Sequence, residues 1–71
     1  MVSYEEARAI VIQRVRTWLA SLPESEKSMP RLVVGTRVYS PLDILREVEM
    51  NSPTGRSFVA QQASALGILI E

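Results

Sequence analysis

The segment from Ser57 to Ile70 contains fourteen residues and not one charge. Its apolar residues recur at spacings of three and four, which predicts a helix from about 54 to 69. One face of this helix would hold Phe58, Val59, Ala63, Leu66, Leu69 and Ile70. The opposite side offers water no charge, and a helix without a charged side is usually buried all round.

The chain is too small to cover such a helix by itself. It has 71 residues, and a chain of this size buries only about 60% of the surface that it exposes when unfolded. It has no cysteine and no histidine, so neither a disulfide nor a structural zinc site can staple it. We therefore expect another protein chain to cover the side that holds Ala60, Gln61, Ser64, Gly67 and Ile68.

Gly67 leaves an alternative open for the end of this segment. Glycine often terminates a helix because it adopts positive φ without strain. In that case residues 68–70 would extend as a strand beside a hairpin predicted earlier in the chain.

Residues 3–22 carry the clearest helix signal. Ser3 and Glu6 form a capping box, and Pro23 stops the helix from continuing. The apolar stripe consists of Tyr4, Ala7, Val11, Val15, Trp18 and Leu22. Arg8 falls inside this stripe. Either its head reaches water beyond an apolar stem, or it is a charged anchor for a carboxylate of a partner.

Residues 23–30 are polar and bounded by prolines, which predicts an exposed connector. Residues 31–39 are rich in β-branched residues around Gly35-Thr36, which is typical of a hairpin with a two-residue type II′ turn. In that register Val33 faces Val38 and Leu32 faces Tyr39. A short loop with one strand is the rival interpretation.

A helix from about 41 to 50 follows, because Ser40 suits the N-cap position and Pro41 suits N1. Ser52 and Pro53 repeat this signal before the last helix, with Thr54 as a competing cap. The whole chain, 1–71, is then a single small domain of the α+β class. It is dominated by helix: a long N-terminal helix, a short hairpin and two further helices.

Catalysis is not expected. Without His and Cys the commonest general base and the best nucleophile are missing. Asp43 and Glu47 lie one helical turn apart, a spacing that suits a divalent metal, but a helix cap and a solvated side chain explain them more simply. We expect no enzyme activity, no metal and no cofactor.

The segment Thr54-Gly55-Arg56-Ser57 is a weak candidate for an anion or DNA contact at a helix start. The two last helices have helix-turn-helix proportions, and residues 54–62 would then read DNA. Against this, eight basic and eight acidic residues give a net charge of zero, so nothing draws the chain to nucleic acid.

The favoured hypothesis is a small protein–protein interaction module, a homodimer or a subunit of a larger assembly. Its expected contact residues are Arg8, Ala60, Gln61, Ser64, Gly67 and Ile68. No apolar run is long enough to span a membrane and the first residues do not resemble a signal peptide, so we expect no membrane partner and a cytoplasmic location.

Overall fold

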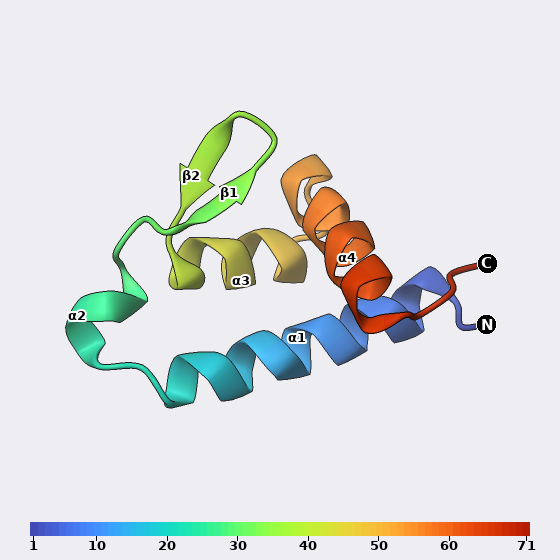
Figure 1. Ribbon diagram of the computed structural model, residues 1–71, viewed down its shortest axis with the longest axis horizontal. Coiled ribbons are helices and arrows are strands. Elements are labelled where there is room, and N and C mark those ends of the chain that lie inside the picture. The colour runs from blue at the N-terminus through green and yellow to red at the C-terminus, as the bar shows by residue number, and fades with distance from the viewer.

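A computed structural model describes all residues, 1–71 (Figure 1). Its elements follow in the order α1 (Tyr4–Ala20), α2 (Glu24–Lys27), β1 (Leu32–Val34), β2 (Arg37–Tyr39), α3 (Pro41–Glu49) and α4 (Pro53–Leu66). This confirms the predicted fold class, a helix-dominated α+β domain with a hairpin between the first helix and the last two.

The start of α1 is fixed by the capping box that the sequence predicts. The Ser3 hydroxyl accepts a hydrogen bond from the Glu6 amide at 3.1 Å, and the Glu6 carboxylate accepts one from the Ser3 amide at 3.4 Å. The helix ends at Ala20, before the expected limit at 22, because Ser21 closes its last turn. Its buried stripe is Ala7, Val11, Val15 and Leu19.

The predicted connector at residues 23–30 is mostly exposed, and it contains one helical turn that the sequence did not indicate. Glu24–Lys27 form the single turn of α2. Pro23 supplies a suitable φ before the helix, and Lys27 pairs with Glu24 at 2.9 Å. Acidic residues at its start and a basic residue at its end match the helix dipole. In the sequence these residues read only as part of a polar loop.

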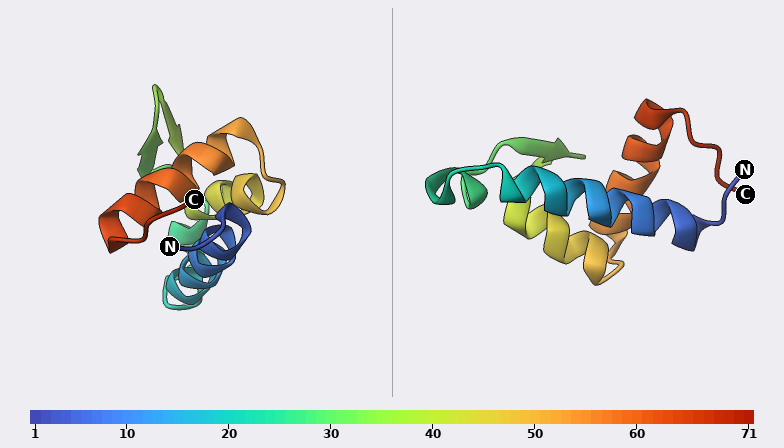
Figure 2. Two further views of the ribbon diagram at one scale, coloured as in Figure 1. Left: turned by 90° about the vertical axis from the view of Figure 1, so that its right-hand side faces the viewer. Right: turned by 90° about the horizontal axis from the view of Figure 1, so that it is seen from below.

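The hairpin has the predicted register: Leu32 pairs with Tyr39 and Val33 with Val38. Gly35 has φ +65°, and Thr36 is not among the residues with positive φ, a combination that fits type II′ and not type I′. Val34 is buried, whereas the cross-strand pair Val33 and Val38 points outward, 63% and 55% exposed. The hairpin projects from the helices (Figure 2, left).

The core lies where α1, α3 and α4 meet, and α3 runs between α1 and the hairpin in Figure 1. Its most deeply buried large side chains include Ile44 and Val48 of α3 and Val59 of α4. The other members of the cluster are Ala7, Val11, Val15, Leu19, Val34 and Phe58. Pro41 and Ser40 are also buried at the start of α3, where Ser40 is the N-cap that the sequence predicts.

The turn between α3 and α4 is short. Asn51 takes a left-handed conformation, φ 53°, which asparagine tolerates better than most residues. Ser52 then caps α4 by accepting a hydrogen bond from the Gly55 amide at 3.0 Å. Thr54 therefore does not act as the cap.

The last helix ends at Leu66 and not at 69, because Gly67 adopts φ 74° and closes it. The alternative prediction, that Gly67 ends the helix, is therefore confirmed. Its second part, that residues 68–70 extend beside the hairpin, is wrong. Ile70 forms a parallel bridge with Val2 and does not join the hairpin. Hydrogen bonds of 2.9 Å from the Val2 amide to Leu69 and 3.0 Å from the Glu71 amide to Val2 hold the two ends of the chain together.

Candidate interaction surface

One side of α4 is committed to the core. Phe58, Val59 and Ala63 are buried, and so is Gly55. A Cβ at position 55 would overlap the carbonyl group of Glu47 in α3. The glycine therefore lets the first turn of α4 approach the end of α3 closely, and this contact fixes which side of α4 remains outside.

The outer side of α4 is exposed and uncharged. We define the outer face of α4 as Ser57, Ala60, Gln61, Ser64 and Gly67, all of which are exposed. Of the six residues predicted for the partner contact, four lie in this face: Ala60, Gln61, Ser64 and Gly67. Ile68 is half-buried, and Arg8 lies on α1. The exposed side chains of Leu66 and Leu69, 38% and 69% accessible, lie at the C-terminal end of the same helix and just beyond it.

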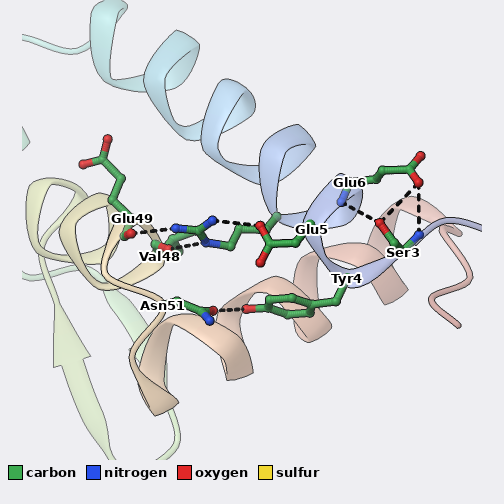
Figure 3. A network of polar contacts seen from close by, with 8 residues as sticks. Ser3, Tyr4, Glu5, Glu6, Val48, Glu49 and Asn51 are labelled. Carbon is green, nitrogen blue, oxygen red and sulfur yellow. Dashed lines mark hydrogen bonds and ion pairs between the residues drawn. The ribbon is translucent and has the colours of Figure 1, made fainter.

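Arg8 has a different environment from these residues. Its Nε donates to the carbonyl of Val48 at 2.9 Å, and its two terminal nitrogens donate to the carbonyl of Glu49 at 2.6 Å and to the carboxylate of Glu5 at 3.1 Å. Figure 3 shows Glu5 at the start of α1 on the side that faces Val48 and Glu49 at the end of α3. These bonds occupy the Arg8 guanidinium within the chain, and Arg8 does not belong to the outer face of α4.

A second contact joins the start of α1 to the turn between α3 and α4. The Tyr4 hydroxyl donates to the Asn51 side-chain oxygen at 2.6 Å (Figure 3). Burial raises the pKa of the Tyr4 phenol above its ordinary value; the positive charges of Arg8 and Arg56 oppose this shift, and Glu5 adds to it. The phenol therefore holds its proton more tightly in the folded chain.

The predicted anion or DNA contact lies at the start of α4. Arg56 and Ser57 are exposed, and Arg56 forms no ion pair. Thr54 is half-buried, with its hydroxyl 3.3 Å from that of Tyr39. Thr54 and Ser57 share a shallow pocket of about 330 Å³ with Arg37 of the hairpin.

Asp43 and Glu47 do not form a carboxylate pair with shared ligands. Asp43 occupies the first turn of α3, where its amide donates to the Ser40 hydroxyl at 3.1 Å. The Glu47 carboxylate accepts from the Ser52 hydroxyl at 3.0 Å. Glu47 is half-buried beside the cap of α4 and is not the freely solvated side chain that the sequence suggested. No group of three or more acidic side chains gathers anywhere in the chain.

A groove that sequence reasoning missed separates α1 from β1 and α4. It measures about 640 Å³, and we call it the Trp18 groove. The wall from α1 consists of Gln13, Arg14, Val15, Thr17, Trp18 and Ser21. The opposite wall consists of Leu32, Phe58 and Gln62. Trp18 fits the apolar stripe of its helix and was therefore interpreted as core. Only the placement of the hairpin and α4 leaves it half-buried beside a hollow.

Comparison with known proteins adds no relative. No protein-family model matches the chain, and no curated protein and no solved structure is detectably similar to it. None of the helices combines the length and the apolarity needed to cross a membrane.

Proposed function

We propose that this protein is a small protein–protein interaction module that associates through the outer face of α4, with a second copy of itself as the first partner. The observation that carries the proposal is that this face is exposed from Ser57 to Gly67 and has no charged side chain over that length; the exposed Arg56 lies at its N-terminal edge. Most exposed helix faces are solvated by charged residues, so an uncharged face on a short chain calls for a different explanation.

The side chains of the face suit close helix packing. Ala60, Ser64 and Gly67 are small, and small residues let the backbone of another helix approach closely. Covering them removes no ion from water, so the cost of burying charge does not arise. The exposed Leu66 and Leu69 add apolar area at one end. A net charge of zero also gives little repulsion between copies.

The test is the mass in solution of the wild type and one variant. Sedimentation at micromolar concentration should give about twice the 7.9 kDa chain mass for the wild type. Ser64→Arg should give the chain mass itself, because the long cation would have to be buried in the contact. Ser25→Arg, on the exposed side of α2, is the matched control and should leave the dimer intact. A wild type at 7.9 kDa throughout, or an unchanged mass in Ser64→Arg, contradicts the homodimer.

A second candidate is a helix-turn-helix DNA-binding protein, and one observation favours it. α3 and α4 pack together across the short turn at residues 50–52. The start of α4 presents the exposed Arg56, and Ser57 lines a pocket together with Arg37 of the hairpin. In this motif the second helix enters the major groove with its first residues against the base edges. The same outer face would then read DNA.

Titration of a labelled DNA duplex separates the two candidates. DNA binding would be steeply salt-dependent, and Arg56→Ala would lower the salt slope by about one phosphate contact. No binding at low salt removes this candidate. Ser64→Arg also discriminates, since an added cation should strengthen binding to DNA while it breaks a protein contact.

A further inference from the structure

We propose that the Trp18 groove binds a short segment of another protein, one that presents a large apolar side chain and a carboxylate. The groove and the outer face of α4 are separate surfaces. Neither Ala60 nor Ser64 lines the groove, so this second contact stands independently of the homodimer.

The floor of the groove is apolar and holds the only tryptophan of the chain. Trp18 and Leu32 are half-buried, and the edge of the buried Phe58 reaches the same hollow. The groove has a volume of about 640 Å³ and is open to solvent along one side, so it suits a side chain laid into it and not an enclosed ligand. Tryptophan is also enriched among the residues that dominate binding energy at protein interfaces. The floor therefore suits one large apolar side chain of a partner.

The charge of the groove determines the second feature of its occupant. Arg14 is its only charged lining residue, and it makes no ion pair and no side-chain hydrogen bond within the chain. No carboxylate lines the groove. The neighbouring cation Arg31 lies 5.9 Å from the centre of the Trp18 ring and is already paired with Glu26 at 3.4 Å. Complementary potentials steer partners to a surface, so the free guanidinium selects a carboxylate.

The dimensions and the rim limit the occupant to a short segment. From Gln13 to Ser21 the wall rises about 12 Å, which equals about two turns of helix or about four extended residues. Gln13, Thr17 and Gln62 place amide and hydroxyl groups around the opening, where they can bond to the backbone of a bound segment. None of residues 1–71 fills the groove.

The test begins with short random peptides displayed on phage and selected on the immobilised wild-type protein. The selected peptides should share a large apolar residue and Asp or Glu a few positions away. In solution, a synthetic peptide of that consensus should shift the fluorescence of Trp18, which is the sole tryptophan. No enriched consensus, a consensus without an acidic residue, or binding that leaves the Trp18 emission unchanged would overturn the proposal.

Charge reversal makes the test specific. Arg14→Glu should weaken the acidic peptide about tenfold or more, and selection on this variant should enrich Lys or Arg in place of Asp or Glu. Arg46→Glu is the matched control, because Arg46 is an exposed arginine of α3 that also lacks an ion pair. The Arg46→Glu variant should bind the acidic peptide with the affinity of the wild type. Equal losses in both variants would place the contact elsewhere.

Two further measurements separate this proposal from the homodimer. Ser64→Arg should bind the peptide as well as the wild type does, whatever its own mass. Arg14→Glu should retain the wild-type sedimentation mass. If Arg14→Glu instead alters the mass, the occupant of the groove is a second copy, and the proposal of a separate partner is wrong.

Discussion

The Nε of Arg8 donates a hydrogen bond of 2.9 Å to the backbone carbonyl of Val48, and so the first helix closes the C-terminal end of the third. A second bond reaches the carbonyl of Glu49 at 2.6 Å. The last carbonyls of a helix have no partner within the helix, and a cation at this end also matches the negative pole of the dipole. Arg8 therefore ties α1 to the element that α4 packs against.

Arg8→Met should lower the free energy of unfolding by about 1–3 kcal/mol, because the stem is preserved while the charged hydrogen bonds are lost. Urea denaturation measures this change. Arg16→Met is the control: Arg16 pairs with Glu49 on the exposed surface, where an ion pair contributes about 0–1 kcal/mol. An equal loss of unfolding free energy in Arg8→Met and Arg16→Met would show that the hydrogen bonds of Arg8 to α3 stabilise the fold no more than a surface ion pair does.

Gly55→Ala should destabilise the fold by about 1–3 kcal/mol or more, since the added methyl group would meet the backbone of Glu47 and Val48, which cannot move aside freely. In an open helix the same change would be stabilising. Thermal unfolding decides the sign. Arg56→Ala, the exposed neighbour, should change stability by about 0.5 kcal/mol at most. A more stable Gly55→Ala protein would refute the close contact of α3 with α4.

Alkaline pH should weaken the fold through Tyr4. Its folded pKa is raised above the ordinary value by burial, so as pH rises the unfolded chain loses this proton first. The unfolded state then binds fewer protons than the folded state, and the free energy of unfolding falls above about pH 10. Below about pH 10 the Tyr4 phenol is protonated in both states, and its contribution to the stability of the fold is fully present.

Tyr4→Phe should remove this part of the alkaline loss, while costing about 1 kcal/mol at neutral pH because Asn51 loses its hydrogen bond. Denaturation midpoints across the alkaline range measure both effects. If the free energy of unfolding falls equally steeply with pH in the wild type and the variant, Tyr4 does not contribute to the alkaline loss of stability.

Local signals predicted much of the fold. Ser3 with Glu6, Ser40 with Pro41, and Ser52 with Pro53 mark three helix starts, because capping depends only on neighbours in the chain. The hairpin register followed from Gly35-Thr36 in the same way. The pairing of Ile70 with Val2 could not be predicted in this way, because it joins opposite ends of the chain. No local pattern specifies such a partner.

Of the two candidate surfaces, one depends on local spacing in the sequence and the other on how distant elements pack. The exposed, uncharged side of α4 was predictable from helical spacing alone. The Trp18 groove was not, since it arises where α1, β1 and α4 leave space between them. The position of Arg8 within an apolar stripe was visible in the sequence, but its bonds to the end of α3 depend on how two helices cross.

The outer face of α4 can be tested most directly by a spin label, because the chain has no cysteine of its own. A nitroxide attached at Ala65→Cys, an exposed position of α4 beside the outer face, in protein without isotope enrichment, is mixed with ¹⁵N-enriched wild type, so that any signal loss is intermolecular. A dimer formed through the outer face should broaden the amide signals from Ser57 to Gly67. No broadening at concentrations where the wild type sediments as a dimer, or broadening confined to the hairpin, would contradict it.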